Sequence, residues 1–104
     1  MNITHNKNTT SPKLKASVVE PILISCINEI SIYELVDTVQ KILPLSKGSI
    51  KRYLFYLIDY GFILYNGQKQ IVSIEDEGFD LLDAIVEEKR QEGTDIDDII
   101  ITFE

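Results

Sequence analysis

The sequence predicts a mainly helical α+β domain in which a three-helix core is followed by a β-hairpin and a C-terminal helix. Two observations carry this prediction, and both lie in residues 46–74, SKGSIKRYLFYLIDYGFILYNGQKQIVSI. The first is an amphipathic segment that stops at a glycine, and the second is a strand–turn–strand pattern directly after it. The chain length of 104 residues suits one domain with one hydrophobic core.

The amphipathic segment is expected to form a helix over about residues 47–60. Ser46 suits the N-cap, because its hydroxyl can accept a hydrogen bond from the free N–H groups of the first turn. Gly61 suits the helix end, where a left-handed backbone conformation is common. The apolar residues fall on one face of a 3.6-residue helix, and they are Ile50, Leu54, Leu57 and Ile58.

The strand–turn–strand pattern predicts a tight hairpin. Residues 62–65 and 68–74 are rich in β-branched and aromatic residues, which favour strands. Asn66-Gly67 between them is typical of a two-residue type I′ turn, which needs positive φ at both central positions.

Two further helices are expected upstream. The first spans about residues 17–28, with Pro21 tolerated in its first turn or so. The apolar residues of this helix cover so much of its circumference that more than one side of the helix should be buried. This indicates a homodimer through the first and last helices. The apolar residues are Val18, Val19, Ile22, Leu23, Ile24, Cys26, Ile27 and Ile30.

Residues 30–32 leave room for a short third strand before the second helix. Ser31 and Glu34 form a capping-box pair at the start of that helix. The helix is expected to end near residue 42, because the residue before Pro44 avoids helical geometry. Its inward residues are expected to be Leu35, Val36, Val39 and Ile42.

The remaining chain divides into an arm, a last helix and a tail. Residues 1–15 are polar and lack periodicity, so they are expected to be a flexible arm before a domain at 16–92. A fourth helix is expected over about residues 76–91, closed by Gly93, with an inward face of Phe79, Leu82, Ile85 and Val86. The acidic and apolar tail, 93–104, contains a run of high strand propensity at 99–103, which is expected to pair with an edge strand or to pack on the body.

Charge is distributed unevenly along the chain. The net charge is −7, but residues 1–74 carry eight basic and five acidic residues, a net charge of +3. Residues 75–104 carry two basic and twelve acidic residues, a net charge of −10. Charges farther apart than about 8–10 Å are largely screened in physiological salt, so the acidic C-terminal part does not exclude an anionic partner for the first part.

The composition argues against an enzyme, a metal site and a cofactor. The chain has one histidine, His5, and one cysteine, Cys26, whereas metal sites and nucleophilic catalysis need clusters of such groups. No phosphate-binding glycine motif and no small-molecule site is evident. Cys26 lies among apolar residues and is expected to be a core residue. No segment is apolar enough to span a membrane, and a reducing, cytoplasmic compartment is expected.

The segments SIYELVDTVQ, LSKGSIKRYLFYLIDYGFI and VSIEDEGFDLL together resemble the archaeal winged helix-turn-helix transcriptional regulators. The likeness runs over about residues 15–86. That family commonly starts its last helix with Thr-x-x-Gly; here Glu75 stands in the place of the threonine, and Gly78 matches. The resemblance implies a winged helix that binds double-stranded DNA, with the helix at 47–60 in the major groove and the hairpin at 62–74 beside the backbone or the minor groove.

The resemblance also implies which residues face DNA. Arg52 is the candidate for reading a base, because its guanidinium can donate twice to guanine. The other candidates are expected to contact phosphates or to allow close approach, and they are Lys47, Gly48, Ser49, Lys51, Tyr56, Gln68 and Lys69. An ordinary solvated helix face explains the same residues. Phe55 fits no single role, and winged helices also serve as protein-interaction modules without DNA binding.

Overall fold

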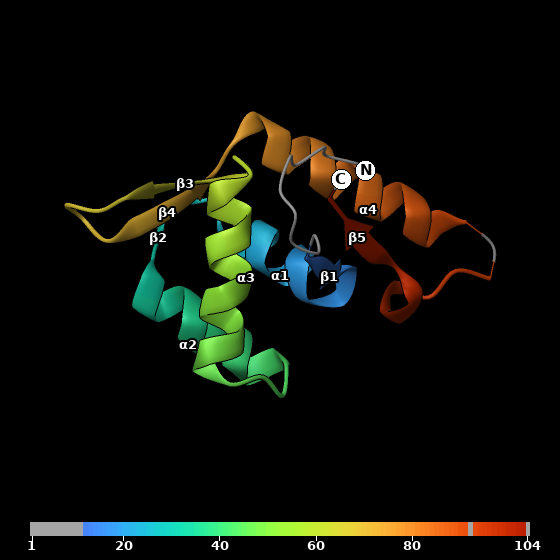
Figure 1. Cartoon of the computed structure of the whole chain (residues 1–104), viewed down its shortest axis with the longest axis horizontal. Coiled ribbons are helices and arrows are strands. Elements are labelled where there is room, and N and C mark those ends of the chain that lie inside the picture. The colour runs from blue at the N-terminus through green and yellow to red at the C-terminus, as the bar shows by residue number, and fades with distance from the viewer. Residues whose placement is uncertain (1–11, 92, 104) are drawn as a thin grey trace.

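The computed structural model describes residues 12–91 and 93–103. It is a compact α+β fold in which helices and two small antiparallel sheets surround one core (Figure 1). The helices are α1 (Ala16–Ser25), α2 (Ile32–Ile42), α3 (Lys47–Asp59) and α4 (Asp76–Arg90), with a 3₁₀ turn, η1, at Ile96–Asp98. The strands are β1 (Lys13–Lys15), β2 (Ile30–Ser31), β3 (Ile63–Asn66), β4 (Ile71–Ile74) and β5 (Ile100–Thr102).

Helix α1 is shorter than predicted, and Pro21 lies in its second turn rather than its first. A proline there removes one backbone hydrogen bond of the helix. The start of the helix has no side-chain cap, but the N–H of Ala16 donates to the carbonyl of Ile99 at 3.0 Å. The N–H of Lys15 donates to the Tyr53 hydroxyl at 3.1 Å. Contacts with distant segments therefore satisfy N–H groups that a helix start leaves free.

Both predicted caps of the next two helices are confirmed. The Ser31 hydroxyl accepts from the N–H of Glu34, and the Ser46 hydroxyl accepts from the N–H of Ser49, each at 3.1 Å. The predicted core residues of α3, Ile50, Leu54 and Leu57, are buried, whereas Ile58 is only partly buried. Ile42 of α2 is 60% exposed, so its predicted inward position is wrong. It is the last residue of its helix, and Leu43 and Leu45 after it pack against the core instead.

The predicted third strand is confirmed, because β2 pairs with β4 in a sheet of order β2-β4-β3. The predicted type I′ turn is wrong. The paired strands end at Asn66 and Ile71, which leaves a four-residue loop. The Asn66 side-chain oxygen accepts from the N–H groups of Gln68 (3.1 Å) and Lys69 (3.2 Å), and Gln70 has a φ of 55°. An asparagine side chain that caps its own turn stabilises this longer loop in place of the tight one.

Helix α4 buries a face that is shifted from the predicted one. Ile85 is buried as predicted, but the other buried residues are Gly78 and Leu81, whereas Phe79 is exposed and Leu82 and Val86 are only partly buried. Gly78 sets this orientation, because a Cβ at that position would overlap the carbonyl oxygen of Phe62 and the side chain of Ile74. A helix that meets the backbone at Gly78 turns Leu81, three residues on, towards the core.

The two ends of the described chain form the second sheet. Strand β1 pairs antiparallel with β5, and Leu14 lies opposite Ile101. The prediction of a flexible arm is therefore wrong for residues 13–15, and its residues 1–11 lie outside the described residues. The expectation that the tail pairs with a strand is confirmed. Phe103 is buried, and its ring stacks on that of Tyr60 with centroids 4.1 Å apart.

Candidate nucleic-acid interface

Helix α3 and the β3–β4 hairpin lie side by side and form the candidate interface (Figure 1). Helix α3 packs its buried face on α2 and the strands, and its remaining residues face outward. The predicted DNA-facing residues Lys47, Gly48, Lys51 and Arg52 are exposed, and Ser49 and Tyr56 are partly exposed. Gln68 and Lys69 are exposed in the hairpin loop.

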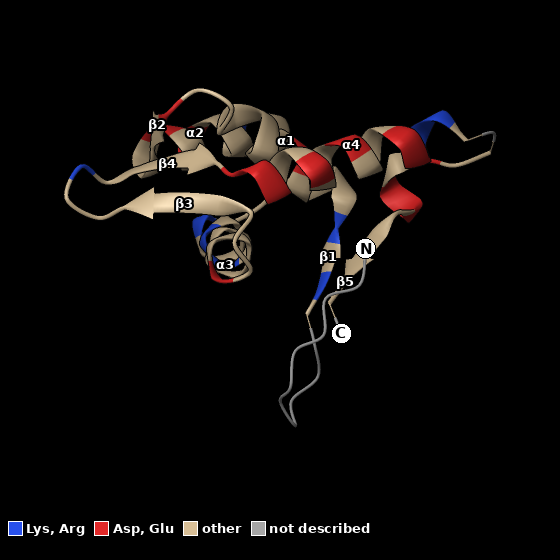
Figure 2. Cartoon of the chain, turned by 90° about the horizontal axis from the view of Figure 1, so that it is seen from above, with Lys and Arg blue, Asp and Glu red and all other residues tan. Residues whose placement is uncertain are grey.

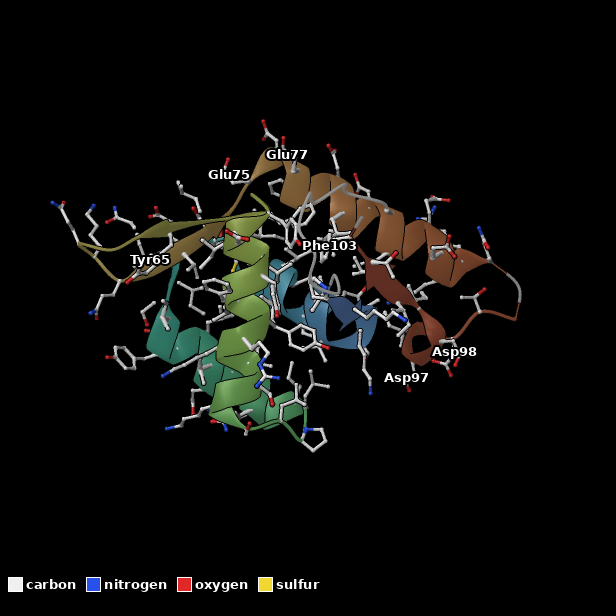
Figure 3. All side chains as sticks on the ribbon, viewed as in Figure 1. Tyr65, Glu75, Glu77, Asp97, Asp98 and Phe103 are labelled. Carbon is white, nitrogen blue, oxygen red and sulfur yellow. The ribbon has the colours of Figure 1, made fainter. Side chains whose placement is uncertain are left out.

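A cleft of about 400 Å³ lies between α2, α3 and the hairpin. Helix α3 contributes Lys47 and Lys51, one turn apart on the same face. The hairpin contributes Tyr65 and Gln70, and Figure 3 shows Tyr65 on the hairpin. Helix α2 contributes the remaining lining, which consists of Ile32, Tyr33, Val36, Asp37 and Gln40. The cleft therefore joins two cations to two tyrosines and two amide side chains.

A second, more apolar hollow of about 480 Å³ adjoins this cleft. The two share Ile32, Lys51 and Tyr65. The second hollow adds Leu54, Phe55, Ile58 and Asp59 of α3. Because they share lining residues, the two hollows form one groove along α3 beside the hairpin. We call it the α3–hairpin groove.

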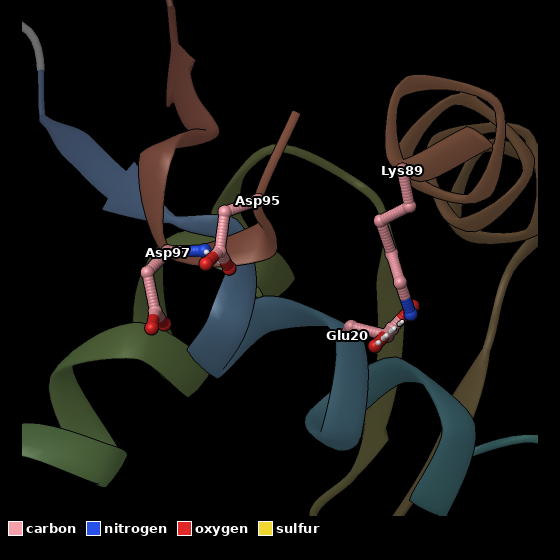
Figure 4. Close-up of polar contacts among 4 residues, drawn as sticks. All are labelled: Glu20, Lys89, Asp95 and Asp97. Atoms are coloured by element: carbon pink, nitrogen blue, oxygen red, sulfur yellow. Dashed lines mark hydrogen bonds and ion pairs between the residues drawn. The ribbon is translucent and has the colours of Figure 1, made fainter. Parts of the chain in front are cut away.

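The basic residues of this surface are not neutralised by neighbouring acids. Among the described residues, Lys47, Lys51, Arg52 and Lys69 form no ion pair. The paired cations lie elsewhere: Lys41 with Asp37 on α2 at 3.0 Å, Lys89 with Glu20 at 3.0 Å (Figure 4), and Arg90 with Glu87 at 3.2 Å.

Acidic and basic residues are unevenly distributed over the molecule. Figure 2 shows basic residues on α3, on β1 and at the hairpin tip, and acidic residues along α4. Asp97 and Asp98 lie in η1, at the opposite end of the molecule from Tyr65 (Figure 3). Two acids also line the groove: Asp37, whose carboxylate is paired with Lys41, and Asp59 in the more apolar part. The lining of the groove therefore combines two lysines that form no ion pair with these two carboxylates.

Only some of the residues predicted to face DNA lie together in the structure. Lys47 and Lys51 line the groove, whereas Gly48, Ser49, Arg52, Tyr56, Gln68 and Lys69 do not. Arg52 is adjacent to Tyr53, whose hydroxyl accepts from the N–H of Lys15, and so it lies on the side of α3 between the groove and β1. The hairpin contribution comes from Tyr65 and Gln70 rather than from Gln68 and Lys69 at the loop tip.

Sequence reasoning missed the contribution of α2. Tyr33, Asp37 and Gln40 follow one another at spacings of four and three residues, which places them on one face of a helix. The buried face of the same helix is a separate stripe, Leu35, Val36 and Val39. The spacing was therefore a usable signal for a second polar and aromatic face. The position of that face across a cleft from the hairpin depends on the β2–β4 pairing, which no helical pattern encodes.

Among residues 12–91 and 93–103, no group of three His, Cys, Asp or Glu side chains lies close enough to hold a metal ion. Burial raises the pKa of the Cys26 thiol from 9.0 to about 12, because desolvation disfavours the thiolate. No helix in the described part of the chain is both long and apolar enough to cross a bilayer.

Comparison with known proteins adds no assignment: no protein-family model matches the chain, and no curated protein matches it.

Proposed function

We propose that this chain is a winged helix-turn-helix transcriptional regulator that binds double-stranded DNA. The proposal places the N-terminal half of α3 in the major groove and the hairpin beside the backbone or the minor groove. In this arrangement Arg52 reads a base, and Lys47, Lys51 and Lys69 contact phosphates. The resemblance to archaeal regulators of this class led to the proposal, and it involves no catalytic step.

The observation that carries the proposal is the position of the unpaired cations. Lys47 and Lys51 project from one face of α3 into a cleft that the hairpin also lines. Arg52 and Lys69 are exposed nearby on the same two elements, without an ion pair to any described residue. A helix and a hairpin that present free cations together are suited to a polyanion, because phosphate contacts supply most non-specific affinity for DNA.

The order of elements also supports the proposal. Helix α1, the short strand β2, helices α2 and α3, the hairpin and α4 follow one another as a winged helix requires, and β2 completes the sheet with β4. The hydrogen bond from Lys15 to Tyr53 ties α3 to β1, which carries two further exposed lysines, Lys13 and Lys15. Helix α3 is thus held by packing on one side and left open on the other.

Neutralising the groove lysines tests the proposal. In Lys47→Ala and Lys51→Ala, each lost phosphate contact should reduce the slope of log K against log salt by about 0.9. Arg90→Ala is the matched control, since Arg90 is an exposed helical cation paired with Glu87 on α4, and neither residue lines the groove. Fluorescence anisotropy on a labelled random duplex at several salt concentrations measures the slope. Equal slopes for the wild type and all three variants would exclude the groove lysines as phosphate contacts.

A second candidate function is a protein-interaction module, and the apolar part of the groove favours it. Leu54, Phe55 and Ile58 line that part, and Phe55 is 63% exposed. The apolar tail does not add to such a surface, because β5 pairs with β1 and Phe103 is buried. The alternative predicts no binding to duplex DNA even at low salt, which the same titration measures.

We also propose that the chain forms a homodimer through α1 and α4. The carbonyl of Cys26 accepts from the N–H of Ile74 at 2.8 Å, which places the end of α1 beside the start of α4. The exposed apolar residues of this region are Ile24 on α1, Ile27 just after α1 and Phe79 on α4. A second copy that covers them would give the paired half-site geometry with which many helix-turn-helix proteins bind DNA.

A further inference from the structure

The α3–hairpin groove contains more aromatic surface than phosphate contact requires. Three exposed aromatic side chains line it: Tyr33 of α2 (72% exposed), Tyr65 of β3 (41%) and Phe55 of α3 (63%). Aromatic side chains of this size are usually buried, either in a core or in an interface. Their gathering in one groove beside two free lysines indicates a ligand with both flat rings and negative charges.

We propose that the α3–hairpin groove binds an unpaired strand of nucleic acid. Proteins that hold single strands combine a basic groove, which follows the phosphates, with aromatic side chains on which successive bases stack. Here Lys47 and Lys51 supply the charge, and Tyr33, Tyr65 and Phe55 supply the stacking surfaces. This inference rests on the proposed function only in assigning nucleic acid to the same face of the molecule.

The groove matches the chemistry of an unpaired strand along its length. Its first part is the more polar and carries the amide side chain of Gln70, which can hydrogen-bond to a base edge, and that of Gln40, whose amide nitrogen donates to the carbonyl of Leu45 at 3.3 Å. Its second part is mainly apolar, lined by Leu54, Phe55 and Ile58 with one acid, Asp59, and it offers a flat base an apolar surface. Lys51 lines both parts, so one ammonium group lies where the backbone of the strand would pass from one part to the other.

The inference also gives Phe55 a role. Its ring meets that of Tyr56 edge-on, with centroids 5.9 Å apart, and it remains exposed. A duplex keeps its bases stacked on one another, so a protruding ring gains little from it beyond a contact with a thymine methyl. An unpaired base offers a whole face for stacking.

The test is the affinity of the full chain for labelled oligonucleotides at low salt, by fluorescence anisotropy. The probes are a ten-nucleotide oligo(dT), a ten-nucleotide oligo(rU) and a duplex of random sequence. We expect binding of a single strand to weaken by about 5- to 150-fold in each of Tyr33→Ala and Phe55→Ala, the loss of one stacked base. Duplex affinity should change less than about twofold, because duplex binding rests on phosphate contacts.

Two controls separate stacking from unfolding and from simple loss of apolar surface. Tyr33→Phe keeps the ring and should bind single strands like the wild type. Ile42→Ala removes an apolar side chain of comparable exposure (60%) that does not line the groove, and it should leave every affinity unchanged. Circular dichroism melting of each variant checks that the fold is intact.

The outcomes separate this inference from the proposed function. Single-strand binding that depends on the rings supports the inference whether or not the duplex binds, and the oligo(dT) and oligo(rU) arms show which nucleic acid is preferred. Absence of single-strand binding beside normal duplex binding overturns the inference alone. Single-strand binding that is equal in the wild type and in both alanine variants also overturns it, because charge alone would then explain the affinity.

Discussion

Arg52 and Lys51 are neighbours on α3, but they face different surroundings. Lys51 lines the groove, whereas Arg52 is exposed on the side nearer to β1. The guanidinium can donate two parallel hydrogen bonds to one guanine, and the ammonium of Lys51 acts as a point charge on phosphate. At the scale of single residues, the proposed function therefore assigns sequence selectivity to Arg52 and general affinity to Lys51.

This difference gives a pair of matched substitutions. Arg52→Ala should weaken binding to a selected target duplex by about 1–3 kcal/mol and relax the preference at one base position. Lys51→Ala should weaken binding to all sequences alike. Competition between the target and a random duplex measures both effects. Equal losses on target and random duplex in Arg52→Ala would remove the base-reading role of Arg52.

Cys26 gives a prediction about pH. Its thiol is buried, and its pKa is raised from 9.0 to about 12. Above pH 9 the unfolded chain loses this proton while the folded protein retains it. The contribution of the thiol to stability is therefore complete below pH 9 and falls by about 1.4 kcal/mol per pH unit from there towards pH 12.

The measurement is urea unfolding of the wild type and of Cys26→Ala between pH 8 and pH 10.5. Alanine has no titrating group, so the variant should lose less stability over this range, whatever its stability at pH 8. Parallel pH profiles for the two proteins would show that the thiol ionises equally in the folded and unfolded states.

At the scale of elements, Gly78 fixes the packing of α4. A Cβ at this position would overlap the carbonyl oxygen of Phe62, which accepts from the N–H of Glu75 at 3.0 Å. Gly78→Ala should destabilise the protein by about 1–3 kcal/mol, the usual cost of overpacking. Gly48 is the matched control, since an added Cβ there meets only the Ser46 hydroxyl at 3.9 Å.

Gly48→Ala should stabilise the protein by about 0.5–1 kcal/mol, because alanine loses less backbone freedom than glycine on helix formation. Thermal unfolding followed by circular dichroism gives both values. A Gly78→Ala protein as stable as the wild type would mean that α4 can move away from Phe62 at little cost, contrary to the packing described here.

The elements most predictable from sequence were those that local chemistry determines. The caps of α2 and α3, the core stripe of α3 and the short strand β2 follow from Ser31, Ser46 and the spacing of apolar residues. Strand β1 was missed because a three-residue strand with one apolar residue, Leu14, has no periodic signal. Its formation depends on β5, which lies more than 80 residues away in the chain.

The candidate site was likewise predictable only where local sequence patterns determine it. The basic face of α3 was readable from a helical wheel, and Lys47 and Lys51 do lie together in the groove. The hairpin tip was chosen from a two-residue turn, but the loop has four residues, and Tyr65 and Gln70 line the groove instead. The Asn66 side-chain oxygen accepts from the N–H groups of Gln68 and Lys69, which stabilises the longer loop, whereas the Asn-Gly pair itself is compatible with both turns.

At the scale of the whole molecule, the proposed dimer would cover the exposed apolar residues of α1 and α4. Light scattering at micromolar concentration should give twice the mass of one chain, and Ile24→Glu should reduce it to that of a monomer, because a charge buried in an apolar contact is costly. A monomeric wild type at these concentrations would contradict the proposed dimer and leave DNA binding to be judged separately.

The uneven charge of the molecule is compatible with binding to DNA. The acidic residues lie mainly on α4, η1 and their surroundings, away from α3 and the hairpin tip (Figure 2). A net charge of −7 should lower the affinity for a polyanion as a whole, but screening limits the effect of charges beyond about 8–10 Å. Binding to duplex DNA should therefore be present at low salt and weaken steadily as the salt concentration rises.

The central claim is that the free cations of α3 and the hairpin bind duplex DNA. The most direct test is the binding constant of the wild type for a random duplex between 50 and 200 mM salt. Two to four phosphate contacts per chain, at about 0.9 each, predict a slope of log K against log salt of about −2 to −4. No binding at the lowest salt, or a binding constant that does not change with salt, would contradict it.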